Sequence, residues 1–141
     1  YWEVGALTQR NALSETKEGC MASRYGKKFD RGLRQLRKEC PLKTPIKVQT
    51  KDLSKEKLCG CCVAYLSAKG KIEKFVIEID RNMPVPTAID TLLHEWAHAM
   101  DKEANGIPLE PHRNSWGEMY AKTWRVYLGK DEEEEEEDAN E

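Results

Sequence analysis

The stretch Thr91-Leu92-Leu93-His94-Glu95-Trp96-Ala97-His98 decides how the rest of the chain is interpreted. It places the pattern H-E-x-x-H behind an apolar lead-in, which favours a helix. With 3.6 residues per turn, His94 and His98 lie about 40° apart on one face of that helix. Two imidazoles with this spacing can bind one metal ion, and Glu95 lies beside them to accept a proton from water. A chance motif is disfavoured because all three histidines of the chain lie between positions 94 and 112.

The opposite arc of the same helix is apolar, and it contains Ile89, Leu92, Leu93, Trp96, Ala99 and Met100. We therefore expect the helix to pack through this arc and to point its histidines outward. Thr87 is a suitable N-cap, with Asp90 three positions later as the acid of a capping box. These residues predict a helix from Thr87 to about Ala104.

At 141 residues the chain fits one domain with a substantial core, which we expect to cover residues 1–130. The eight consecutive acids from Asp131 to Asp138 predict a disordered acidic tail over 131–141. No apolar run approaches the roughly 20 residues that span a bilayer, and no signal-peptide pattern opens the sequence. We expect a monomer without a membrane partner that is not secreted and is cytoplasmic or, in a eukaryote, nuclear.

The five cysteines form an odd set without a secretion signal, which indicates reduced thiols. Cys59, Cys61 and Cys62 could suggest a metal site, but the chain lacks a second pair at zinc-ribbon spacing. We expect these residues to be small core or surface side chains, since a free cysteine often behaves as a small buried apolar residue.

The flanking segments predict an α+β domain. A short helix is expected over Ala6–Lys17 and an amphipathic helix over Lys27–Glu39, where Phe29, Leu33 and Leu36 have helical spacing. Apolar runs predict strands over Ile46–Gln49, Cys61–Leu66 and Phe75–Ile79, the last two joined as a hairpin by the turn 67–71. A final helix is expected from near His112 to Gly129, with Trp116, Tyr120, Trp124 and Tyr127 as a core stripe. The result is an N-terminal helix, a small, mainly antiparallel sheet of about three strands, the H-E-x-x-H helix and a C-terminal helix.

The net charge of −2 conceals an asymmetry, because residues 1–75 carry +9 and residues 76–141 carry −11. Such a basic half is either a solvated surface or a contact for nucleic acid. On the second interpretation we expect weak, sequence-independent DNA binding that is strongest at low salt. The candidate residues, all within fifteen positions, are Arg24, Lys27, Lys28, Arg31, Arg34, Arg37 and Lys38.

A catalytic zinc ion usually takes three protein ligands, so a third ligand is needed beyond the motif. A third His six residues after the second is excluded because position 104 is Ala. His112 and Glu118 both remain open, and we favour His112 because imidazole suits zinc better than an exposed carboxylate does. Asp101 shares the ligand face, where it either orients a histidine or is a helix-end acid. Tyr120 either stabilises an oxyanion or packs in the core.

The H-E-x-x-H pattern at 94–98 followed by Pro111-His112-Arg113-Asn114-Ser115-Trp116 resembles the SprT-like metalloprotease family, which includes the Spartan DNA–protein-crosslink proteases. The resemblance covers about residues 46–129 and implies a zincin-like fold. It also implies Zn²⁺ held by His94, His98 and His112, with Glu95 as general base for peptide hydrolysis. The chain departs from the family in having no zinc ribbon after Gly129 and in having Arg113 where a small residue is usual.

Three functional hypotheses follow from these residues. The first is a zinc endopeptidase acting on DNA-associated or DNA-crosslinked proteins, and the basic half favours it. The second is a regulatory zinc protease that cuts one soluble protein partner. The third is a non-enzymatic binding module stapled by zinc, which Glu95 disfavours because a structural site has no use for a carboxylate beside its ligands.

Overall fold

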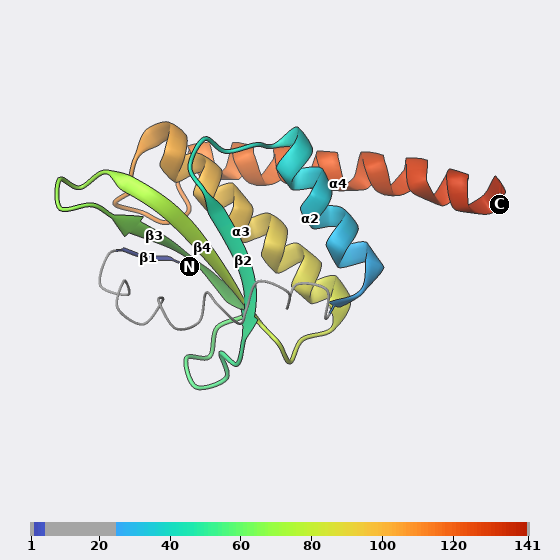
Figure 1. Ribbon diagram of the computed structural model, residues 1–141, viewed down its shortest axis with the longest axis horizontal. Helices are drawn as coiled ribbons and strands as arrows, with labels where there is room; N and C mark the ends of the chain where they lie inside the picture. The colour runs from blue at the N-terminus through green and yellow to red at the C-terminus, as the bar shows by residue number, and fades with distance from the viewer. Residues whose placement is uncertain (1, 5–24, 141) are drawn as a thin grey trace.

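A computed structural model describes residues 2–4 and 25–140 of the chain, with side-chain surroundings over 25–129. One sheet carries a layer of helices on one side (Figure 1). The expected α+β architecture is confirmed: one helix precedes the main strands, and two helices that pack together follow them. The helix expected over Ala6–Lys17 lies outside the described residues. The elements are β1 (Trp2–Val4), α2 (Lys27–Glu39), β2 (Ile46–Lys51), β3 (Gly60–Leu66), β4 (Ile72–Asp80), α3 (Val85–Asn105) and α4 (Asn114–Asn140).

The sheet contains the three expected strands and the short β1, in the order β1-β3-β4-β2. β3 and β4 form the expected antiparallel hairpin, whose turn includes Gly70 at φ +81°. The expectation of a mainly antiparallel sheet is wrong, because β1 pairs with β3 and β2 pairs with β4 in parallel. The sheet is therefore mixed. Alternation of apolar residues indicates a strand, but it does not identify the strand's partner or direction.

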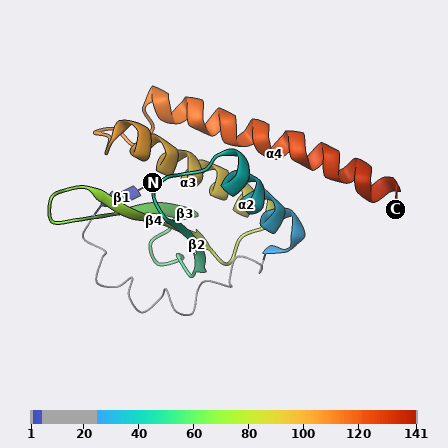
Figure 2. The same cartoon turned by 45° about the horizontal axis from the view of Figure 1, so that its top comes forward.

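The core lies between the sheet and the helices. α2 contributes Phe29 and Leu36, and α3 contributes Leu92 and Leu93, all fully buried. Trp96 is 1% exposed, and its indole Nε1 donates to the carbonyl of Cys40 at 3.0 Å. These contacts join α3 to the end of α2 and fix the helix that carries the H-E-x-x-H motif. Figure 2 shows α4 running across α3 and α2 on the side away from the sheet.

α3 begins two residues earlier than expected. Its N-cap is Pro84, which makes no side-chain cap, so the capping box of Thr87 and Asp90 is wrong. Pro86 fits the first turn because the backbone N–H that proline lacks has no helical partner there. At the other end, Gly106 takes φ +79°, a left-handed conformation that favours glycine at a helix end.

α4 does not end at Gly129, as the sequence suggested, but continues to Asn140. Gly129 is not among the residues with positive φ, so it does not terminate the helix, and the glutamates after it are good helix formers. The domain division at residue 130 stays a prediction. The disordered acidic tail expected over 131–141 also stays a prediction.

Candidate metal centre

Three imidazoles from two separate segments converge at the middle of α3. His98 Nε2 lies 3.2 Å from His94 Nε2, and His112 Nε2 lies 3.2 Å from the same atom. All three ligand nitrogens lie within 4.8 Å of one another. His112 comes from the loop between α3 and α4, which turns back over the motif. Among the described residues, this is the group of His, Cys, Asp and Glu side chains that could hold a metal ion.

The spacing of His94 to each of the other two imidazoles fits a tetrahedral ion. Zn–N bonds of about 2.0–2.1 Å with tetrahedral angles put neighbouring ligand nitrogens roughly 3.3–3.4 Å apart. Two of the three pairs, both involving His94, lie at 3.2 Å. Glu118, the alternative third ligand, is exposed on α4 and does not belong to the cluster. The donor set that the fold brings together is therefore three imidazoles.

The surroundings keep these imidazoles neutral, which is the form that binds metals. Burial lowers the pKa of His98 to about 2 and that of His94 to about 4. The pKa of His112 is also lowered, again chiefly by desolvation. The contact of 3.8 Å between His94 Nε2 and Glu95 Oε2 is consequently not an ion pair at neutral pH.

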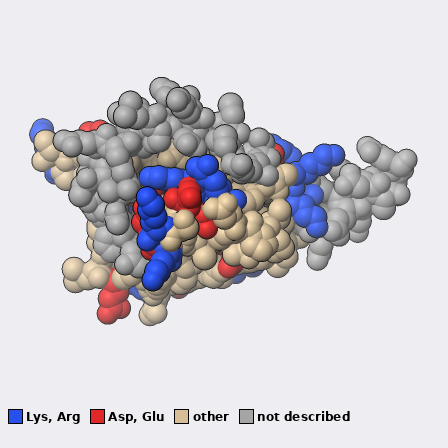
Figure 3. Space-filling model, turned by 90° about the horizontal axis from the view of Figure 1, so that it is seen from below, with Lys and Arg blue, Asp and Glu red and all other residues tan. Residues whose placement is uncertain are grey.

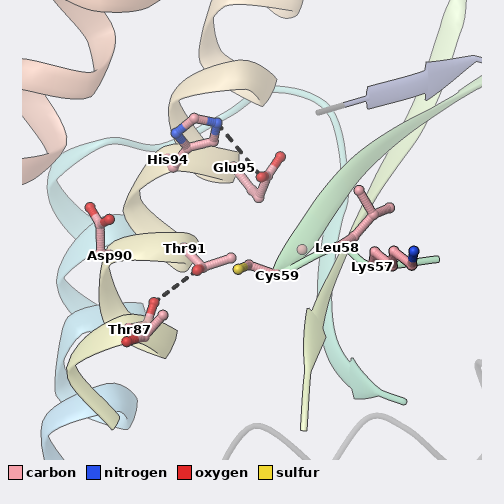
Figure 4. A pocket seen from close by; sticks show the side chains of 9 residues that line it. Lys57, Leu58, Cys59, Thr87, Asp90, Thr91, His94 and Glu95 are labelled. Atoms are coloured by element: carbon pink, nitrogen blue, oxygen red, sulfur yellow. Dashed lines mark hydrogen bonds and ion pairs between the residues drawn. The ribbon is translucent and has the colours of Figure 1, made fainter. Parts of the chain in front are cut away.

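Glu95 lies next to His94 at the wall of a cavity of about 300 Å³. The carboxylate is only 2% exposed, and burial raises its pKa to about 7. Figure 4 shows His94 and Glu95 at one end of this cavity, between α3 and the start of β3. The cavity is lined by Lys57, Leu58, Cys59, Gly60, Thr87, Asp90, Thr91, His94 and Glu95. A carboxylate and an imidazole of the candidate metal site thus share one open cavity.

Gly60 allows the strand to approach the helix at this point. A Cβ at Gly60 would lie 2.5 Å from Thr91 Cγ2 and 2.8 Å from the carbonyl oxygen of Glu78. The same Cβ would lie 3.7 Å from Glu95 Cγ, in ordinary contact. The lack of a side chain at position 60 therefore sets the distance between β3 and the part of α3 that holds Glu95.

The ligand face of α3 is turned outward only in part, because His98 is covered, and this corrects the expectation from the sequence. His98 is 1% exposed, because the Trp116 ring of α4 stacks on it with a centroid distance of 5.2 Å. The Trp116 ring also contacts His94 and His112, and its Nε1 donates to the carbonyl of His94 at 3.3 Å. The aromatic stripe of α4 therefore has two parts, since Tyr127 is buried in the core while Trp116 packs on the three histidines.

A hydrogen bond to Asp90 fixes the orientation of the Tyr120 side chain. Its hydroxyl donates to Asp90 Oδ1, which also accepts from Trp124 Nε1 at 3.2 Å. Its ring stacks on Trp116 with centroids 5.1 Å apart and also packs against the core. The sequence left two roles open for Tyr120, oxyanion stabilisation and core packing, and these contacts favour core packing.

Asp101 is joined to the loop that carries the third histidine. Its carboxylate is 1% exposed and accepts from Asn105 Nδ2 at 2.9 Å and from Arg113 Nε at 2.6 Å. Burial by itself would raise the pKa of Asp101, but hydrogen bonds from Ser115, Arg113 and Asn105 outweigh it and lower the pKa. In the described part of the chain, no histidine donates to Asp101; sequence reasoning missed Arg113 as its partner.

The basic residues of α2 do not all share one surface. Arg31 is buried and Arg24 lies outside the described residues, whereas Lys27, Lys28, Arg34, Arg37 and Lys38 are exposed. Arg37 makes a cation–π contact, because its guanidinium carbon lies 5.8 Å from the centroid of the Trp96 ring. On a different face, shown in Figure 3, Lys and Arg side chains surround a group of Asp and Glu side chains.

The cysteines are not part of the metal centre. Cys61 and Cys62 are buried free thiols, and burial raises the pKa of Cys62 to about 12. Cys59 is exposed at the cavity wall, and Cys20 lies outside the described residues. These positions agree with the prediction of small core or surface side chains.

Comparison of the chain with protein families, with curated proteins and with solved structures gives no match. No helix within the described residues is long and apolar enough to cross a membrane. The functional conclusion therefore depends on the geometry of the site.

Proposed function

We propose that this protein is a zinc-dependent endopeptidase with His94, His98 and His112 as ligands and Glu95 as general base. The observation that carries the proposal is a buried carboxylate beside three converging imidazoles at an open cavity. A zinc ion bound by these residues would supply Lewis acidity and lower the pKa of a coordinated water to about 7.

The protein's own residues then have defined roles. The Glu95 carboxylate accepts the proton of the attacking water and delivers it to the nitrogen of the leaving amine. Trp116 packs on the three imidazoles and excludes water from that side. The cavity beside His94 and Glu95 admits the substrate backbone.

Two features favour an enzyme over a zinc-stapled binding module. Structural zinc sites are usually closed by four protein ligands. In the described residues, no fourth His, Cys, Asp or Glu joins the three histidines. The resemblance of residues 94–98 and 111–116 to the SprT-like metalloproteases supports peptide hydrolysis as the reaction.

For the substrate class we propose proteins associated with DNA, rather than one soluble partner. The observation that favours this class is an exposed basic row on α2. Lys27, Arg34 and Lys38 are exposed and lie within about 40° of one another around the helix. Charges on one side of a helix can follow the phosphates of a nucleic acid.

The decisive experiment compares the zinc-loaded full chain with the variant Glu95→Gln on fluorescently labelled casein. The amide keeps the shape of the carboxylate but cannot accept a proton, so cleavage should fall by about 10²–10⁴-fold. Metal analysis should find one zinc per chain in both proteins. Cleavage by the variant at the wild-type rate would exclude Glu95 as the base. A zinc-loaded wild type that cleaves neither casein nor a DNA-bound basic protein would favour the binding module.

A further inference from the structure

We infer that Asp101 and Arg113 form a clamp that positions His112 for metal binding. The inference rests on the proposed metal centre and concerns two residues that would not touch the ion. The clamp is defined as the Asp101 carboxylate, the Arg113 guanidinium and the carbonyl of Gly106.

His112 needs support that the other two histidines do not. His94 and His98 are held by the backbone of α3, and His98 is buried. His112 is exposed and lies in a loop of the chain between two helices. A loop residue that reaches a metal without support would lose conformational freedom on binding and weaken the affinity.

Arg113 supplies that support with a forked side chain. Its Nε donates to Asp101 Oδ2 at 2.6 Å, and its Nη2 donates to the carbonyl of Gly106 at 2.6 Å. The loop from 106 to 113 is therefore closed at its base, one residue from His112. Only a planar guanidinium presents several donors in a fixed geometry for this bridge.

The anchor of the clamp is rigid. Asp101 lies on α3 and is almost fully buried, and it also accepts hydrogen bonds from Asn105 and from Ser115 in the first turn of α4. The carbonyl of Gly106 lies at the C-terminal end of α3, where the helix dipole attracts a cation. The same carboxylate thus holds Arg113 and Ser115, which follow His112 by one and three positions.

The test measures zinc affinity by competition with a chelator for the full chain and for Arg113→Ala, Asp101→Asn and the double variant. Each single variant should bind zinc about 10–100-fold more weakly, the usual cost of losing a residue that orients a ligand. The loss in the double variant should be smaller than the sum of the two single losses, because both single variants remove the Asp101–Arg113 interaction. Arg125→Ala is the matched control, since it removes an exposed arginine of α4, and it should keep wild-type affinity.

A second readout separates positioning from general stability. The visible absorption of bound Co²⁺ depends on coordination number, and His112→Ala provides the reference for a two-histidine site. The spectrum of Arg113→Ala should shift toward that reference, while circular dichroism of the metal-free chain stays unchanged. If Arg113→Ala does not fold, Arg113→Lys decides, since a lysine cannot bridge Asp101 and Gly106 at once.

Wild-type zinc affinity and an unchanged Co²⁺ spectrum in Arg113→Ala or Arg113→Lys would overturn the clamp and leave the proposed function intact. Absence of zinc binding by the wild-type chain would overturn both. These two failures are distinguished by the wild-type measurement.

Discussion

His112 is the residue on which the candidate metal centre depends most, because it alone comes from outside α3. It lies 18 residues after His94 in the chain, and yet their Nε2 atoms are 3.2 Å apart. Any two histidines at positions i and i+4 of a helix share a face, so His94 and His98 need no tertiary structure to meet. The third histidine reaches them only because the loop between α3 and α4 folds back.

His112→Ala should weaken zinc binding by more than about 100-fold, since loss of a ligand exceeds the usual effect of losing a residue that orients one. Chelator competition followed by metal analysis measures the change. Glu118→Ala serves as the control because Glu118 is exposed on α4 and outside the cluster. The reverse pattern, with zinc lost only from Glu118→Ala, would make Glu118 the third ligand.

Asp101 should stabilise the metal-free fold in a pH-dependent way. Its pKa is lowered in the folded chain, below the unfolded value of about 3.9. The stabilisation is therefore complete above that value and is lost as the pH falls through the folded pKa. At pH 7, Asp101→Asn should unfold at a lower urea concentration than the wild type. Its free energy of unfolding should be smaller by about 2 kcal/mol, the contribution expected of hydrogen bonds to a charged group. That difference should shrink at about pH 3, and a difference that grows on acidification would refute the assignment.

At the scale of elements, α3 is the central feature of the molecule because it packs against the sheet, against α2 and against α4. β3 and β4 pack on its apolar arc, and α4 packs on the face that carries the histidines. Buried residues therefore occur all around the helix, including Glu95, His98 and Asp101. The amphipathic pattern of the sequence indicated one buried face, but Trp116 of α4 also covers His98, and Gly60 of β3 lies close to Glu95.

Gly60→Ala should disturb the junction of β3 and α3. The new Cβ would meet the Thr91 side chain and the backbone carbonyl of Glu78, and the carbonyl cannot move without disturbing β4. We expect destabilisation of about 1–3 kcal/mol, as for overpacking of a core, together with loss of casein cleavage. Urea unfolding and a cleavage assay measure the two effects.

Gly129→Ala is the matched control, because a Cβ at Gly129 meets nothing within 4 Å and the residue lies inside α4. Alanine is the better helix former, so this variant should be unchanged or up to about 1 kcal/mol more stable. Equal effects at the two glycines would show that close approach at Gly60 is unimportant.

For the whole molecule, the distribution of charge decides whether DNA can be a partner. Residues 1–75 carry +9 and residues 76–141 carry −11, so the net field is slightly negative. Charges more than about 10 Å apart are largely screened at 0.1 M salt, so a local row of cations can act independently of the total. The exposed row Lys27, Arg34 and Lys38 on α2 is the local feature that remains after Arg31 is found buried.

The chain should bind duplex DNA weakly, without sequence preference and most strongly at low salt. With three phosphate contacts the affinity should fall roughly 40-fold between about 50 and 200 mM salt. Removal of residues 131–141 should tighten binding, because the acids from Asp131 to Asp138 compete with phosphate for the basic row. A fluorescence titration of the intact and shortened chains measures both effects.

The control for that titration removes three positive charges from residues outside α2. Replacing Lys27, Arg34 and Lys38 with alanine should abolish binding, while replacing the exposed Lys55, Lys69 and Lys71 should not. No binding by either chain at low salt would remove DNA from the proposal and favour a protease for a soluble protein.

The sequence by itself determined the local structure and the chemistry of the motif. Hydrophobic periodicity depends on neighbouring residues, so α2, the β3–β4 hairpin and the helix carrying His94, Glu95 and His98 were predictable from spacing. The identity of the candidate ligands was likewise predictable, because a chain with three histidines offers few alternatives.

Only the tertiary structure decided which segments meet. Strand partners and directions depend on how the chain crosses the sheet, so the parallel pairing of β2 with β4 could not be derived from alternation. The covering of His98 by Trp116 depends on the packing of α4 against α3, a contact between residues distant in sequence. The pairing of Asp101 with Arg113 likewise required the loop to fold back, because a charge pair is specified by distance in space and not by separation along the chain.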